Sequence, residues 1–273
     1  MKLALTATPS QGRFAPIVMR GPLEPSLALA SELGYDGIEL HLRRPGDIDR
    51  AALKKLADQL GLAFSTIGTG MAASEDGLTF VHPDPDVRRA AVERVMEHIE
   101  LGRYLGAAIA IGLVRGALGR EPELRAQRLH WFDACLQECC ASASSAGVNL
   151  VLEPINRYET DFLNTVDDCL EVLDRIGSPR LKLLLDTFHM NIEEGDILAS
   201  FRRAAPHLGH VHLADSNRQA PGHGHLDVRG VLQVLREANY QGYIAFEVLP
   251  LPDPRQAAED AIRTVRTLLA GLT

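Results

Sequence analysis

Short apolar runs alternate with longer amphipathic segments along the whole chain. The short runs are rich in β-branched and aliphatic residues, which is typical of buried strands, and the longer segments repeat apolar residues at helical spacing. Residues 49–60, for example, place Leu53, Leu56 and Leu60 on one helical stripe. This alternation predicts eight strands, at residues 2–7, 37–42, 63–68, 107–114, 149–155, 181–186, 209–214 and 243–249.

Capping residues support the helical segments between these strands. Asp84 precedes the amphipathic stretch 85–104 and is a suitable N-cap. Several other segments end at a glycine just before the next strand, as helices that end in a left-handed residue do. These glycines are Gly34, Gly61, Gly106, Gly147 and Gly177.

Strands that alternate with helices pair in parallel through right-handed crossovers. Eight such units in 273 residues predict an α/β protein with a closed (β/α)8 TIM barrel, formed by residues 1–273 as one domain. The competing arrangement is a doubly wound open sheet. It is disfavoured because the segment after the first strand, residues 8–12, reads Thr-Pro-Ser-Gln-Gly and lacks a glycine-rich phosphate-binding fingerprint.

The composition limits the kinds of molecule that we expect the protein to bind. The formal net charge of −8 disfavours binding to nucleic acid or to an anionic membrane surface, because both need clustered positive charge. No apolar run approaches membrane-spanning length and no signal peptide is evident, so we expect a soluble cytoplasmic protein. The four cysteines lack metal-binding or disulfide-framework spacing and are interpreted as reduced packing thiols: Cys135, Cys139, Cys140 and Cys169.

Metal-competent side chains end four consecutive predicted strands. The runs close on Glu153, Asp186, His212 and Glu247. A single carboxylate in such a place is more often a helix cap, and a single strand histidine such as His210 is more often a hydrogen-bonded core residue. Three acids and one imidazole on one barrel rim, however, would repel one another without a cation. The mostly oxygen ligand set favours Mn²⁺, Mg²⁺ or Co²⁺ over Zn²⁺.

Further polar residues follow these strand ends in loops that should face the same cavity. Glu159, His189 and Arg218 each lie a few residues beyond a proposed ligand, and we expect them to hydrogen-bond a substrate. Arg115, after the fourth strand, either pairs with a substrate carboxylate or forms a salt bridge on the rim. Two long loops, 69–86 and 215–227, could cover the ligand, and His223 and His225 are interpreted as lid residues.

Four segments resemble the ketose 3-epimerases, a group that includes D-tagatose and D-psicose 3-epimerases within the xylose isomerase-like TIM-barrel superfamily. The segments are residues 153–165, 186–194, 212–218 and 246–252. Two N-terminal stretches, 67–70 and 112–116, look like the related branch that acts on 5-keto-L-gluconate.

The resemblance implies a Mn²⁺- or Co²⁺-dependent enzyme, a dimer or tetramer, that epimerises a ketose or keto-sugar acid at C3. It implies that Glu153, Asp186, His212 and Glu247 bind the metal. Glu159, His189 and Arg218 would hold the O1–O3 end of the sugar. Glu153 and Glu247 would exchange protons with carbon through an enediolate.

Three alternatives remain open at this stage. The first is an aldose–ketose or phosphosugar isomerase on the same scaffold. The second is an apurinic-site endonuclease, which would need more histidine ligands and a basic face, and which the charge of −8 disfavours. The third is a non-catalytic sugar-binding barrel, which would leave the pair Glu153 and Glu247 without a role.

Overall fold

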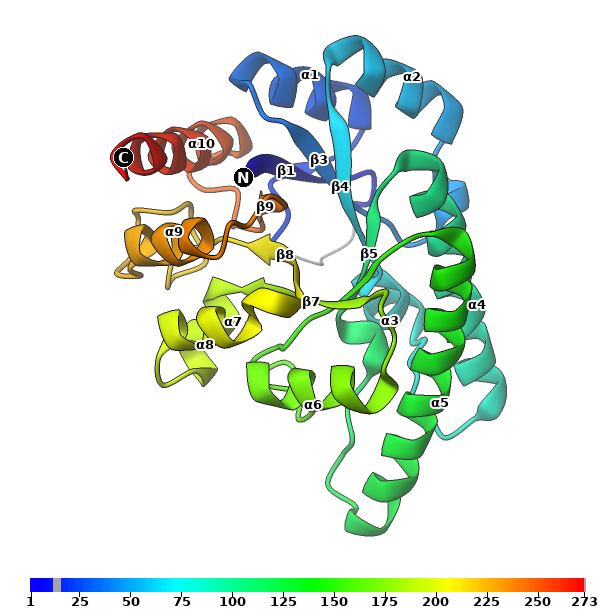
Figure 1. Ribbon diagram of the computed structural model, residues 1–273. Helices are drawn as coiled ribbons and strands as arrows, with labels where there is room; N and C mark the ends of the chain where they lie inside the picture. The colour runs from blue at the N-terminus through cyan, green and yellow to red at the C-terminus, as the bar shows by residue number, and fades with distance from the viewer. Residues whose placement is uncertain (12–15, 273) are drawn as a thin grey trace.

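Eight parallel strands form a closed barrel in the computed structural model, which describes residues 1–11 and 16–272. The last strand pairs with the first, with Phe246 opposite Leu5, so the sheet has no open edge and the doubly wound alternative is wrong. Figure 1 shows the helices arranged around this barrel. The barrel strands are β1 (Lys2–Thr8), β3 (Gly37–His41), β4 (Ala63–Gly68), β5 (Ala108–Ile111), β6 (Leu150–Leu152), β7 (Leu181–Asp186), β8 (Leu208–His212) and β9 (Tyr243–Phe246).

The helices begin and end at the predicted signals. Asp84 accepts the N–H of Asp86 at the start of the fourth helix, and the five predicted glycines end their helices with φ between 67° and 81°. No helix among the described residues has both the length and the apolar content that a membrane span needs. The helices are α1 (Leu23–Leu33), α2 (Arg50–Leu60), α3 (Gly70–Asp76), α4 (Pro85–Leu105), α5 (Pro122–Ala146), α6 (Val166–Ile176), α7 (Thr187–Glu193), α8 (Ile197–Ala204), α9 (Val228–Glu237) and α10 (Pro254–Ala270), with short 3-10 turns η1 (Pro45–Asp47), η2 (Leu113–Arg115) and η3 (Ala205–His207).

Several predicted strands were too long at their carboxyl ends. The strand predicted at 107–114 ends at Ile111 because the chain turns into η2, and the strand predicted at 149–155 ends at Leu152. The predicted loop 69–86 contains α3. A two-residue strand, β2 (Met19–Arg20), pairs with β1 and was not predicted, since two residues carry no periodicity.

Strand alternation separates an apolar outer face from an inner face on which apolar and polar residues both occur. On β7, Leu183 and Leu185 belong to the large core between sheet and helices, whereas Leu184 belongs to a separate small cluster. The same alternation turns Glu39 of β3 and His210 of β8 toward the barrel interior, where both are buried. The interior therefore supplies buried polar groups beneath the carboxyl ends of the strands.

The four cysteines are free and buried, in agreement with the interpretation as packing thiols. Burial raises the pKa of all four thiols, and raises that of Cys169 to about 12.

Candidate active site

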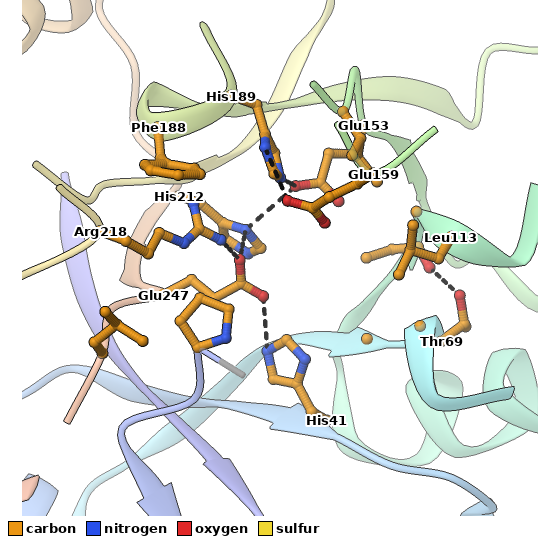
Figure 2. Close-up of a pocket in the computed structure, with 17 residues that line it drawn as sticks. His41, Thr69, Leu113, Glu153, Glu159, Phe188, His189, His212, Arg218 and Glu247 are labelled. Atoms are coloured by element: carbon orange, nitrogen blue, oxygen red, sulfur yellow. Dashed lines mark hydrogen bonds and ion pairs between the residues drawn. The ribbon is translucent and has the colours of Figure 1, made fainter. Parts of the chain in front are cut away.

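The barrel brings the four predicted ligands together at the carboxyl ends of neighbouring strands. Asp186 and His212 are the last residues of β7 and β8, and Glu153 and Glu247 directly follow β6 and β9. One ligand atom from each lies within 4.8 Å of every other, and all four side chains are buried. Figure 2 shows Glu153 and Glu247 extending into the cavity from different sides.

His212 turns a ring nitrogen that has no hydrogen-bond partner toward this cluster. Its Nε2 donates to Oε1 of Glu39 at 2.8 Å, because a carboxylate oxygen can only accept. Its buried Nδ1 has no hydrogen-bond partner, and it lies 3.4 Å from Glu247, 3.7 Å from Glu153 and 3.8 Å from Asp186. A buried ring nitrogen without a hydrogen-bond partner, beside three carboxylates, is the arrangement that a divalent cation satisfies when it replaces the proton on that nitrogen, so these residues fit a metal ion.

The charges in the cluster depend strongly on one another. Burial alone would raise the pKa of Asp186, but Arg218, His189 and His212 together outweigh burial, and the pKa lies far below its ordinary value. Burial likewise opposes the lowered pKa of Glu247, which His212 and Arg218 cause. Burial would lower the pKa of His212, yet Glu39 and Glu247 hold it well above the ordinary value. Without a cation, the site is thus kept together by a proton and a guanidinium.

Arg218 is that guanidinium, and it reaches both walls of the cluster. It donates to Asp186 Oδ2 and to Glu247 Oε2, and it stacks on the ring of Phe188 with 4.7 Å between the guanidinium carbon and the ring centroid. Its backbone has φ of 63°, an uncommon conformation for a residue with a side chain. Such a conformation persists only where the surrounding structure holds it.

A buried carboxylate organises the loop that carries Arg218. Asp215 accepts the backbone N–H groups of Ser216, Gly222 and Leu226, at 2.7, 2.7 and 3.0 Å. Loop 215–227 is therefore folded around one side chain. It does not have the sparse contacts that are expected of a flexible lid.

Asn156 connects two of the predicted substrate-binding residues. Its Nδ2 donates to Glu159 Oε1 at 2.9 Å and lies 2.7 Å from His189 Nδ1. Because the amide nitrogen can only donate, His189 Nδ1 accepts and Nε2 carries the proton. Nε2 lies 3.8 Å from Glu153, so His189 presents a hydrogen-bond donor at the metal-ligand cluster.

These groups surround a cavity of about 250 Å³ with an apolar wall. Leu113, Ile155, Phe188 and Leu249 supply that wall, and Thr69 closes one side by bonding the carbonyl of Ala110. The cavity can therefore hold a molecule with one polar, chelating end and one less polar end.

Arg115 does not reach the cavity. Its side chain is fully buried and donates to the main-chain carbonyl oxygens of Glu153, Phe162 and Leu163. The suggested pairing with a substrate carboxylate, and the alternative salt bridge on the rim, are therefore not what the structure contains. Arg115 instead holds together the loop that begins with Glu153.

Two histidines suggested for the lid form ordinary contacts within it. His223 Nε2 lies 3.2 Å from Asp260 of α10, and His225 Nδ1 lies 2.9 Å from the Ser216 hydroxyl. Neither belongs to a ligand cluster among the described residues.

Sequence reasoning missed Glu39, His41 and Asn156. Glu39 and His41 lie two residues apart on β3 and point to the same side, and His41 lines the cavity 3.8 Å from Glu247. The signal for Glu39 was only its charge within an otherwise buried strand. Nothing local indicated that its partners are 171 and 173 residues away.

Comparison with known proteins places this geometry in a family. Residues 27–268 match the family described as Xylose isomerase-like TIM barrel. The L-ribulose 3-epimerase of Mesorhizobium japonicum is 35% identical over 227 residues, which are 82% of this chain and 75% of that protein. The 3-dehydro-D-guloside 4-epimerase of Escherichia coli is 36% identical over 126 residues, 46% of this chain and 48% of that protein.

Solved structures agree with these relatives. A structure of L-ribulose 3-epimerase has a TM-score of 0.85 and 28% sequence identity, and the match covers 99% of this chain and 95% of that one. The closed barrel, the buried cluster at its carboxyl rim and these relatives lead to one assignment. The chain belongs to the xylose isomerase-like TIM-barrel family and, within it, to the sugar epimerases.

Proposed function

We propose that the protein is a metal-dependent epimerase that inverts C3 of a ketose or keto-sugar acid, with Glu153 and Glu247 as the acid and base. The observation that carries the proposal is the position of these two carboxylates, which enter one cavity from different strands beside an unpartnered imidazole nitrogen. Inversion at carbon needs proton removal on one face and proton return on the other, which two separate carboxylates can perform.

Glu153, Asp186, His212 and Glu247 would hold the cation, for which Mn²⁺ fits the ligand set best and Co²⁺ or Mg²⁺ also fit. A bound cation would polarise the substrate carbonyl and so acidify C3, the adjacent carbon that carries the hydroxyl. The Nε2–H of His189 and the guanidinium of Arg218 would stabilise negative charge on the sugar oxygens. Glu159, whose side chain is partly exposed at the mouth, would accept from the terminal hydroxyl.

The cavity favours a ketose over a sugar acid or sugar phosphate. Among the described residues that line it, Arg218 is the one Arg or Lys, and its donors already serve Asp186 and Glu247. With Arg115 turned away, no further Arg or Lys among the described residues lines the cavity to pair with an anionic group of the substrate. This also disfavours the phosphosugar isomerase alternative.

The test follows proton exchange in deuterated solvent, with the two C3 epimers of one ketose offered separately and NMR as the readout. Glu153→Gln and Glu247→Gln should each lower epimerisation by at least about 10²-fold. Each variant should also lose C3 exchange for the epimer whose proton that residue removes. Because Gln keeps a ligating oxygen, metal content is measured on each variant as the control.

Epimerisation at the unaltered rate by metal-loaded Glu247→Gln would refute the two-carboxylate mechanism. Formation of an aldose from the ketose would favour the isomerase alternative. The panel contains tagatose, fructose, psicose and 5-keto-gluconate.

A second candidate is epimerisation at C4 of a 3-keto sugar, which the name of the E. coli relative favours. The chemistry is the same, since the proton removed again lies next to a carbonyl. Adding a 3-keto-glycoside to the panel separates the two, because its turnover without turnover of the ketoses would favour C4.

A further inference from the structure

Glu39 lies at the floor of the cluster and is fully buried. It extends from β3 across the barrel interior to β8, two strands that do not pair with each other. Its carboxylate forms no ion pair with an Arg or Lys among the described residues. A buried carboxylate in that position is costly unless hydrogen bonds satisfy its oxygens.

Three imidazoles provide those hydrogen bonds. Oε1 accepts from Nε2 of His41 at 2.9 Å and from Nε2 of His212 at 2.8 Å, and Oε2 accepts from Nε2 of His210 at 2.6 Å. Because the carboxylate can only accept, each of these nitrogens carries a proton that is directed at Glu39. One side chain thus sets the orientation of three rings.

The consequence for His212 is specific. With its proton on Nε2, the neutral ring leaves the lone pair on Nδ1, which is the atom that faces Glu153, Asp186 and Glu247. The opposite tautomer would place a proton between the ring and three carboxylates and would remove the nitrogen as a ligand. A carboxylate behind a ligating histidine also makes that histidine more basic.

The same oxygen connects to the other side of the cavity. His41, which shares Oε1 with His212, lies 3.8 Å from Glu247, and Figure 2 shows its ring beneath that carboxylate. Gly68 makes room for the ring, because a Cβ there would lie 2.7 Å from His41 Nδ1. Glu39 therefore reaches two groups that border Glu247.

We propose that Glu39 is a positioning residue that fixes the metal-binding tautomer of His212 and holds His41 beneath Glu247. This inference rests on the proposed function, since it assigns Glu39 to the metal site of that reaction. It adds a residue that touches neither the cation nor the sugar.

The test compares two substitutions in the same network by Mn²⁺ titration calorimetry. Glu39→Leu removes the acceptor behind His212 and should raise the Mn²⁺ dissociation constant about 10- to 100-fold. His210→Phe is the matched control. It keeps a ring packed against His212, 5.3 Å between centroids, and removes a buried hydrogen bond of Glu39, but it leaves the bond to His212 intact. Its dissociation constant should stay within about threefold of the unaltered protein, a margin well below the 10-fold loss expected for the acceptor.

Unchanged Mn²⁺ affinity in Glu39→Leu, or an equal loss in both variants, would overturn the assignment, because a general packing role affects both alike. Should Glu39→Leu fail to fold, the unaltered protein loaded with Mg²⁺ is examined by long-range ¹H–¹⁵N NMR of its histidines. A slowly exchanging proton on His212 Nε2 supports the inference, and a proton on Nδ1 overturns it.

The two proposals fail separately. Mn²⁺ binding that depends on Glu39, in a protein that turns over no sugar, would remove the proposed reaction and support the inference. Epimerase activity together with unchanged Mn²⁺ affinity in Glu39→Leu would support the proposed reaction and overturn the inference about Glu39.

Discussion

Replacing Arg115 with Met distinguishes a residue that supports the loop after β6 from one that recognises substrate. The guanidinium is fully buried and donates to the carbonyl oxygens of Glu153, Phe162 and Leu163. Met is unbranched and has no donor, and it ends about where the guanidinium of Arg115 begins, so all three bonds are lost while the packing of the aliphatic stem remains.

The expected loss in the free energy of unfolding depends on which carbonyl oxygens are left without a hydrogen-bond donor. The carbonyl oxygen of Leu163 also accepts the N–H of Ile155, whereas the carbonyl oxygens of Glu153 and Phe162 accept no second hydrogen bond from the described residues. A buried polar group without a partner costs about 1–3 kcal/mol, and removal of the buried charge offsets part of this. We expect Arg115→Met to lower the free energy of unfolding by about 3 kcal/mol, a substantial part of the ~5–15 kcal/mol of a typical domain.

Urea denaturation followed by far-UV circular dichroism measures this loss. Arg103→Met is the matched control, because Arg103 forms an exposed ion pair with Glu100 that should contribute no more than about 1 kcal/mol. Mn²⁺ affinity should fall as well, since the loop carrying Glu153 loses its support. An unchanged urea midpoint, together with a raised KM for 5-keto-gluconate alone, would refute this reasoning and restore the substrate-carboxylate role.

Three further predictions concern the Arg218 loop and the thiols. Gly224→Ala should lower kcat/KM without loss of helical signal, because its Cβ would lie 2.2 Å from Asp215 Oδ1 and would displace the loop; full activity would count against the folded-loop interpretation. Burial alone would raise the pKa of Asp215, but hydrogen bonds from backbone N–H groups, including those of Leu226 and Ser216, lower it below its ordinary value. The ionised carboxylate therefore stabilises the fold above the unfolded pKa of about 3.9. This stabilisation is lost as the pH falls below that value. Asp215→Asn should therefore be less stable at neutral pH and should show a flatter loss of stability in acid, measured by urea midpoints across pH; an unchanged acid limb would contradict this. Ellman's reagent should label none of the four cysteines in the folded protein and all four in urea, because each thiol is buried with a raised pKa, and rapid labelling of the native protein would show the burial to be wrong.

The fold and the clustering of the four candidate ligands were readable from the sequence because both depend on local patterns. Strand and helix periods and the capping glycines follow from residues close together in the chain. Glu153, Asp186, His212 and Glu247 stand at the ends of apolar runs, and a parallel barrel brings all such ends to one rim. Asp186 also accepts the N–H of Phe188 and so caps α7, which means that the helix-cap interpretation and the metal-ligand interpretation are both compatible with the structure.

The direction of a side chain beyond the end of a strand could not be predicted from the sequence. The period of two predicts which side a residue faces only while the chain remains a strand, and Arg115 is the last residue of η2, beyond the end of β5. Glu39 posed the opposite problem: its inward direction follows from alternation, but its partners on β8 are set by barrel closure. Long-range pairing of this kind leaves no local signal.

The charged and the uncharged residues that line the cavity are distributed unevenly along the chain. Every ionisable residue that lines it, except His41, comes after residue 150, whereas the earlier part of the described chain supplies small or uncharged residues such as Gly68, Thr69 and Leu113. The ionisable groups are thus concentrated in the second half of the chain, whereas both halves contribute to the shape of the cavity, the second through Ile155, Phe188 and Leu249. Substitutions in the first half can alter which sugars fit while the second half keeps the chemistry, so libraries that seek altered substrate preference should concentrate there.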